Sequence, residues 1–158
     1  MKKTFWMLVA SLVMGVVVTN ATMAQLPVGI AAGVRVGTDT ENNDFLAGGQ
    51  VELKIPFFTV VPNYEYTFIK DVTNHRLNVD LQYTVLGIGI AKLFAGGGYV
   101  MNTAKPKGGD SVSENGFNVQ VGGKAGLSKI DVFALARYNK IKKADSFALV
   151  AGINFGLL

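Results

Sequence analysis

Serine and histidine are the side chains here that could support nucleophilic catalysis. The sole histidine is His75, and Ser111, Ser113 and Ser146 lie in or beside predicted loops. A nucleophilic serine needs a nearby base and commonly stands in a Gly-x-Ser-x-Gly turn, which surrounds none of these serines. No histidine and carboxylate residues have the spacing of metal ligands. We therefore predict no catalytic residue, no metal and no cofactor, and a protein that is not an enzyme.

Ion pairing is the chemistry that the spacing favours. From Arg76 to Val85 every odd position is apolar and every even position is polar. Successive side chains of a β-strand point to opposite faces, so the polar side chains of this segment share one face. Its ten residues span about 33 Å, and a tilted strand needs roughly nine to eleven residues to cross a bilayer.

Seven further segments alternate in the same way. The predicted strands are residues 26–37, 45–55, 57–69, 76–85, 90–101, 117–127, 132–139 and 147–157. Pro62 lies inside the third segment, where it predicts a bulge or a weakened ladder position. The fold class is therefore all-β, an eight-stranded antiparallel up-and-down barrel.

Closing these strands would bring their polar faces together in a lumen. The inward residues predicted to form a structural polar network there are Arg35, Gln50, Glu52, Lys54, Glu65, Arg76, Asp80, Lys92, Lys124 and Arg137. Phe94, Phe133 and Leu135 are apolar exceptions on the same face. An eight-stranded barrel has room for little beyond side chains. We therefore favour a plugged lumen over a narrow, weakly anion-preferring path.

The connections between the predicted strands alternate in length. Residues 38–44, 70–74, 102–115 and 140–145 are predicted loops, and the turns at Pro56, 86–89 and 128–129 are short. In a meander this places every long loop at one end of the barrel, the loop end, and every tight turn at the other, the turn end. Outward aromatic residues gather near both ends: Phe45, Tyr66, Phe68, Tyr99, Phe117, Tyr138 and Phe147 at the loop end, and Phe58, Tyr83 and Phe155 at the turn end. Two such girdles are expected at two membrane–water interfaces.

The N-terminus has the pattern of a secretory signal peptide. Lys2 and Lys3 precede an apolar run from Phe5 to Val18, and small residues lead to a cleavage point after Ala24. We predict a signal peptide over residues 1–24 and one barrel domain over residues 25–158. Removing two lysines lowers the formal net charge from +4 to +2. The remaining lysines and arginines do not gather on one face, so no nucleic-acid partner is predicted.

The chain resembles the small eight-stranded outer-membrane β-barrel proteins of Gram-negative bacteria, which include porin-like barrel domains. The resemblance covers the chain from residue 25 onward. It rests on pattern and on Tyr83, Gly96-Gly97-Gly98-Tyr99, Ala136-Arg137-Tyr138 and Gly152-Ile153-Asn154-Phe155. It implies a multi-pass protein of the outer membrane, with short periplasmic turns and longer external loops.

The same resemblance implies the partners. They are outer-membrane lipid and the barrel-assembly machinery during insertion, with a monomer as the expected state. The role would be structural, surface-binding or adhesion-type, carried by the loops over residues 102–115 and 140–145. Lipopolysaccharide phosphates are a possible partner for loop lysines, namely Lys105, Lys107, Lys140, Lys142 and Lys143.

Three alternative functions follow from the same pattern. A narrow porin-like channel would use the surplus of inward basic residues. A lipid-modifying barrel enzyme would need a serine and histidine arrangement that we do not find. A secreted lipocalin-like binder would line its cavity with the apolar face. The opposite face carries fewer lysines and glutamates than a water-facing surface normally does, which favours the membrane barrel.

Overall fold

The computed structural model describes residues 29–142 and 145–157. The predicted signal peptide, the first residues of the first predicted strand and Lys143 lie outside this range. The described residues form eight strands and no helix that could cross a membrane. The strands are β1 Gly29–Asp39, β2 Asp44–Lys54, β3 Phe58–Ile69, β4 Val72–Ile88, β5 Ala91–Pro106, β6 Val112–Leu127, β7 Ile130–Ile141 and β8 Ser146–Gly156.

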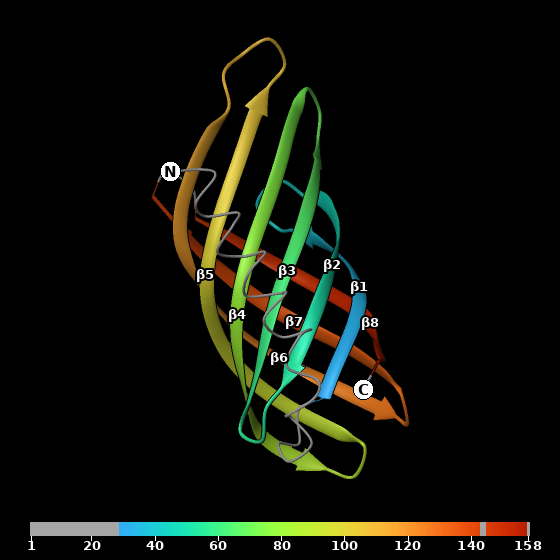
Figure 1. Ribbon diagram of the computed structural model, residues 1–158. Coiled ribbons are helices and arrows are strands. Elements are labelled where there is room, and N and C mark those ends of the chain that lie inside the picture. The colour runs from blue at the N-terminus through green and yellow to red at the C-terminus, as the bar shows by residue number, and fades with distance from the viewer. Residues whose placement is uncertain (1–28, 143–144, 158) are drawn as a thin grey trace, which may run out of the picture.

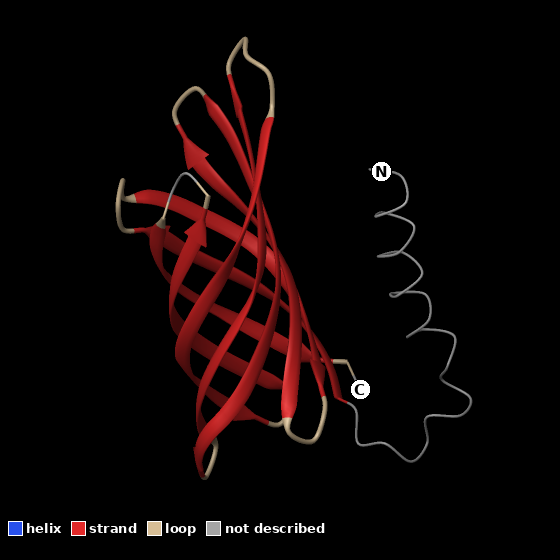
Figure 2. Ribbon diagram, turned by 90° about the vertical axis from the view of Figure 1, so that its left-hand side faces the viewer, coloured by secondary structure: helices blue, strands red, loops and turns tan. Residues whose placement is uncertain are grey.

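The strands close into one antiparallel barrel, which confirms the predicted fold class. Each strand pairs with its sequence neighbours, and β1 pairs with β8 to close the sheet. The register of this closing pair runs from Ala31 opposite Gly156 to Asp39 opposite Ala148. The start of β1 and the end of β8 therefore lie side by side at the turn end of the barrel, which Figure 2 shows from a second side.

The surface of the barrel is the reverse of that of a soluble protein. Large apolar side chains such as Val121, 60% exposed, and Phe117, 57% exposed, cover its outside. Charged and amide side chains such as Glu65 and Asn78 are fully buried inside. A continuous exposed apolar surface of this extent exceeds what soluble monomers tolerate. It matches a barrel whose outer wall contacts lipid.

Aromatic residues form the two predicted girdles as cross-strand pairs. Near the loop end, Phe45 lies opposite Phe68, with their ring centroids 5.6 Å apart. Tyr99 opposite Phe117 and Tyr138 opposite Phe147 repeat this arrangement on the other hairpins. Near the turn end, the ring centroids of Phe58 and Tyr83 are 6.1 Å apart.

The prediction of a long loop over residues 102–115 is wrong. β5 continues to Pro106 and β6 begins at Val112, so the connection is only residues 107–111. Polar residues on both faces concealed the strands, because alternation disappears where neither face is apolar. The strand pairing shows that these residues are in the sheet: Ala104 lies opposite Asn74 of β4 on one side and Val112 of β6 on the other. The hairpin thus rises beyond its neighbours at the top of Figure 1.

The predicted fourth strand is extended at both ends. β4 begins at Val72, so the predicted loop 70–74 shrinks to Lys70 and Asp71, the latter with a positive φ of 61°. It ends at Ile88 rather than Val85, after a register shift between Thr84 and Leu86. The predicted turn over residues 86–89 accordingly moves to residues 89–90.

The connections at the loop end are longer than those at the turn end, except for residues 70–71. The loop-end connections are residues 40–43, 70–71, 107–111 and 142–145, against 55–57, 89–90 and 128–129 at the turn end. Pro62 causes no register shift. The β2–β3 ladder instead lacks its pairs between Gln50–Asn63 and Leu53–Val60, so the weakened ladder position is confirmed and the bulge is not.

Candidate functional site

Three arginines surround one carboxylate in the loop-end half of the lumen. Arg35 Nη1 lies 3.0 Å from Glu65 Oε1, and Arg137 Nη2 lies 2.5 Å from Glu65 Oε2. Arg76 Nη1 lies 3.9 Å from Glu65 Oε2, and Arg76 Nη2 lies 3.7 Å from Asp39 Oδ2. All five side chains are buried. Since an unpaired buried charge is costly, these pairs hold β1, β3, β4 and β7 in one arrangement.

A layer of amides surrounds Asp80 at mid-depth. Its carboxylate accepts hydrogen bonds from Asn63 Nδ2 at 2.8 Å and Asn118 Nδ2 at 2.7 Å, and Asn78 donates to Asn63 at 2.7 Å. Gly98 makes this layer possible. A Cβ there would stand 2.3 Å from Asp80 Oδ1, so only glycine leaves the carboxylate its place.

A third layer centres on Glu52, nearer the turn end. Glu52 Oε1 accepts hydrogen bonds from Asn154 at 2.9 Å, Lys124 at 2.5 Å and Gln50 at 3.4 Å. Gln50 also donates to Asn154 at 2.7 Å. The carboxylate thus joins residues from β2, β6 and β8 across the lumen.

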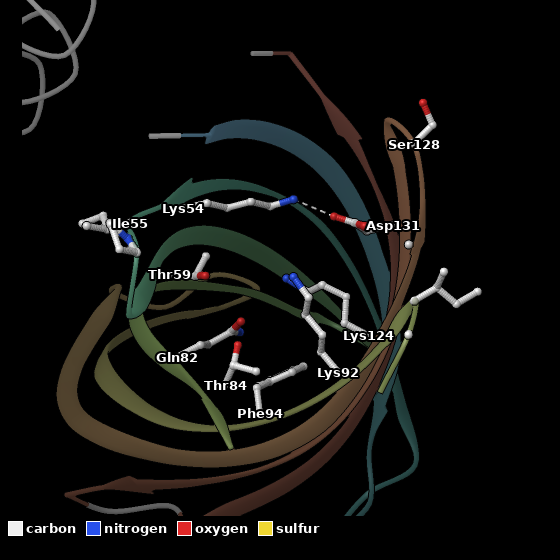
Figure 3. A pocket seen from close by; sticks show the side chains of 14 residues that line it. Lys54, Ile55, Thr59, Gln82, Thr84, Lys92, Phe94, Lys124, Ser128 and Asp131 are labelled. Carbon is white, nitrogen blue, oxygen red and sulfur yellow. Dashed lines mark hydrogen bonds and ion pairs between the residues drawn. The ribbon is translucent and has the colours of Figure 1, made fainter. Parts of the chain in front are cut away.

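The lumen opens at the turn end into a cavity of about 460 Å³. Lys54 Nζ lies 2.6 Å from Asp131 Oδ2 across this mouth, and Lys92 and Lys124 extend into it (Figure 3). Lys92 is exposed and, among the described residues, pairs with no carboxylate.

An apolar cluster fills part of the lumen beside these layers. Its members are Leu46, Phe94, Phe133, Leu135, Ala148 and Val150. Arg35 lies over the Phe133 ring at 5.7 Å, and Lys124 lies over the Phe94 ring at 5.8 Å. Gly152 gives Phe133 its space, because a Cβ there would stand 2.5 Å from the ring. The lumen is therefore packed with apolar as well as polar side chains.

The structure brings nine of the ten predicted network residues into hydrogen bonds or ion pairs within the lumen. These are Arg35, Gln50, Glu52, Lys54, Glu65, Arg76, Asp80, Lys124 and Arg137. Lys92 lies at the mouth, apart from the layers. Sequence reasoning missed the partners Asp39, Asp131 and Asn154. Asp39 was predicted in a loop, yet it ends β1 and faces Arg76.

No hydrogen bond in the described part of the chain joins His75 to any of the serines considered for catalysis. His75 points outward into the loop-end girdle, where it hydrogen-bonds to Tyr64 and its ring lies 5.2 Å from that of Tyr66. Ser113 contacts Thr103 at 2.9 Å, and Ser146 accepts from Asn139 at 3.1 Å. Among the described residues, no three His, Cys, Asp or Glu side chains are grouped so as to hold a metal ion.

Two charged contacts between described residues lie outside the lumen at the loop end. Asp145 accepts hydrogen bonds from Lys140 at 2.6 Å and from Tyr138 at 2.8 Å at the loop end. The hydrogen bond from Lys140 is the largest cause that lowers the pKa of the Asp145 carboxyl, and the hydrogen bond from Tyr138 is the second. Lys107 similarly lies 3.9 Å from Asp71 on the neighbouring hairpin.

Solved outer-membrane barrels share this architecture. The N-terminal β-barrel domain of Pseudomonas aeruginosa OprF matches with a TM-score of 0.70 at 11% identity, covering 82% of this chain and 97% of that one. Neisserial surface protein A matches with a TM-score of 0.61 at 18% identity, covering 81% of this chain and 94% of that one. Ail, the attachment invasion locus protein of Yersinia pestis, matches with a TM-score of 0.58 at 13% identity, covering 82% of this chain and 97% of that one.

The chain has the fold of the small eight-stranded outer-membrane β-barrels. The closed antiparallel sheet of eight strands is the feature that it shares with the three solved barrels. No family model matches the sequence, and no curated protein matches it.

Proposed function

We propose that the protein spans the bacterial outer membrane as a monomeric barrel and has a structural or surface-binding role at its external end. The observation that carries this proposal is the reversed surface. Side chains such as Val79, Leu81 and Val121 are exposed around the barrel, whereas Arg35, Glu65 and Arg137 are fully buried. Such a surface is stable only where lipid replaces water around the wall.

The lumen is a plug in this proposal. Three successive layers centred on Glu65, Asp80 and Glu52 join different strands of the barrel through buried hydrogen bonds in the lumen. An ion would have to break several charge-assisted bonds in sequence to pass. A narrow channel is the second candidate, because basic residues outnumber acidic ones along the predicted inward faces.

The external role falls to the loop-end ribbon, defined as residues 101–106 of β5 and 112–115 of β6. β7 pairs with β6 only from Gly116 onward, so the ribbon ends the sheet on that side. Exposed strand edges accept further strands and peptides. The ribbon extends beyond Tyr99 and Phe117 of the girdle, and it would therefore stand in the external medium.

Contact with lipopolysaccharide phosphates would fall to few lysines. Lys107 and Lys140 already have carboxylate partners, Asp71 and Asp145. Of the five predicted lysines, Lys105 and Lys142 are exposed, have no carboxylate partner among the described residues and are the cations to test. A deep-rough lipopolysaccharide bilayer should bind the Lys105→Ala, Lys142→Ala double variant less tightly than the wild type in low salt.

Membrane insertion and plugging are tested together by fractionation and electrical recording. We expect the expressed protein in outer membranes without residues 1–24, by mass spectrometry, and a gel mobility that differs between heated and unheated samples. Planar bilayers containing the protein should show no stable large conductance. A freely soluble, monomeric, folded protein without detergent would overturn the membrane assignment. Stable high conductance would replace the plug with the channel.

A further inference from the structure

The turn-end cavity has the character of a binding site. Its polar lining comprises Lys54, Thr59, Gln82, Thr84, Lys92, Lys124, Ser128 and Asp131, and Phe94 forms an apolar part of the wall. Figure 3 shows these side chains arranged around one open space, with Lys92 and Lys124 side by side. The volume of about 460 Å³ lies within the range of small-molecule sites and equals the liquid volume of roughly fifteen waters.

The charges of this cavity are unbalanced. Lys124 pairs with Glu52 at 2.5 Å, and Lys54 pairs with Asp131 at 2.6 Å. Glu52 also lies 3.8 Å from Lys54, so the two carboxylates at the mouth are already shared by two lysines. Lys92 is a third cation that shares neither of them. The mouth therefore has a surplus of one positive charge.

The position of Lys92 makes this surplus unusual. Lys92 lies directly opposite Lys124 in the β5–β6 register, with both residues on the inward face. Like charges directly opposite each other on neighbouring strands are destabilising. An anion between the two ammonium groups would convert this repulsion into two attractive contacts.

We propose that the turn-end mouth binds a small phosphate-bearing anion between Lys92 and Lys124. Lysine ammonium groups are compact donors that suit phosphate as point charges. The hydroxyls of Thr59 and Thr84 and the amide of Gln82 add neutral donors around the same space. Phe94 leaves an apolar wall for the organic part of a phosphate monoester.

The site is closed at its inner end. Gln50, Glu52 and Asn154 are buried and hydrogen-bonded to one another directly beyond Lys124. The anion therefore enters and leaves by the turn end and does not cross the barrel. In the membrane orientation proposed above, that end faces the periplasm, but binding itself requires only the folded barrel.

Calorimetric titration of the refolded barrel in nonionic detergent tests this site. The probes are inorganic phosphate and glycerol 3-phosphate at low salt. We expect saturable binding that weakens at least tenfold in Lys92→Ala and declines with added salt. Tighter binding of the ester than of free phosphate would show that the organic group uses the apolar wall, and equal binding would restrict the site to the phosphate group.

Lys92 is the variant of choice because its removal leaves no buried carboxylate without a partner, whereas removal of Lys124 would strand Glu52. Lys129→Ala is the matched control, since Lys129 lies in the turn at the same end but does not line this cavity. An unchanged heat-dependent gel shift verifies that Lys92→Ala folds. Wild type without saturation below roughly 10 mM, or equal loss of binding in Lys129→Ala, overturns the proposal.

Discussion

Glu65 of β3 and Arg137 of β7 meet at 2.5 Å on strands that lie four places apart in the closed eight-stranded sheet. The pair therefore spans the full width of the lumen, and both side chains are completely buried. Arg35 joins the same carboxylate at 3.0 Å from β1. One acidic side chain thus links three walls of the barrel.

Replacing Glu65 should be the most damaging single change in the lumen. Glu65→Ala leaves Arg35, Arg76 and Arg137 buried around an absent partner, a situation that typically costs about 3–5 kcal/mol. Urea unfolding in detergent or lipid should show this loss. Glu41→Ala, in the exposed 40–43 connection, is the control and should change stability little. Equal stability of the two variants would contradict the proposed role of the cluster.

Asp80→Ala should destabilise the barrel without opening it. The change removes the acceptor of the bonds from Asn63 and Asn118, and each unsatisfied buried group costs about 1–3 kcal/mol. Arg76→Ala should have an effect of similar size, because it leaves Asp39 without its cation. Bilayer recordings of both variants should stay free of large conductance, since two of the three layers remain intact in each variant. A large pore in either variant would show that one layer alone closes the lumen.

Gly98→Ala should disturb the same layer through sterics. The new methyl group would stand 2.3 Å from Asp80 Oδ1 and 2.4 Å from the Val79 carbonyl oxygen. Overpacking of this kind costs about 1–3 kcal/mol. Gly123→Ala is the matched control, because the nearest atom to its added Cβ is 3.6 Å away on Leu93. Chemical denaturation that ranks the two variants equally would refute the steric explanation.

The depth of the membrane can be mapped with two valines of β6. Val121 is 60% exposed midway along the wall, and Val112 is 51% exposed in the loop-end ribbon. Val121→Arg should cost about 2–4 kcal/mol in lipid, whereas Val112→Arg should cost about 0–1 kcal/mol, because a charge is penalised by its depth in hydrocarbon. Reversible unfolding from lipid vesicles measures both. Similar costs would place the two valines in the same medium.

Asp145 should titrate below its ordinary value because of its hydrogen bonds from Lys140 and Tyr138. A depressed pKa means that these bonds favour the folded loop at neutral pH and that their contribution is lost as pH falls through the lowered value. In a carboxyl NMR titration, Lys140→Ala should raise the Asp145 midpoint and Lys105→Ala should leave it unchanged. An Asp145 titration midpoint that is unchanged in Lys140→Ala would show that Lys140 does not lower the pKa of this carboxyl.

Alternation predicted the faces of the strands better than their lengths. In residues 76–85 the apolar face is continuous, so Asn78 and Asp80 were correctly assigned to the inside. Beyond the girdles neither face meets lipid, and Thr103 and Ser113 therefore look like loop residues although they pair across β5 and β6. The period of two carries information only where the two faces meet different media.

Contacts across the lumen were beyond the reach of sequence patterns. The alternation of odd and even positions placed Lys54 and Glu65 inside, but it could not pair Lys54 with Asp131 or Glu65 with Arg137. Those partners depend on how far the strands are staggered when the sheet closes. Leu46, Ala148 and Val150 occupy inward positions by the same alternation. Their joining of Phe94 and Phe133 in one apolar cluster needed the closed structure.

The pairing of β1 with β8 determines when the barrel can be completed. Every other strand pair joins neighbours through a short connection, but Ala31 meets Gly156 only after the chain between them has been made. Closing so long a loop is slow, because its conformational entropy is lost before any contact is gained. The hairpins can therefore form early and leave β1 and β8 as open edges. Those two edges are where an unfinished barrel would aggregate, and where a helper protein would have to hold it.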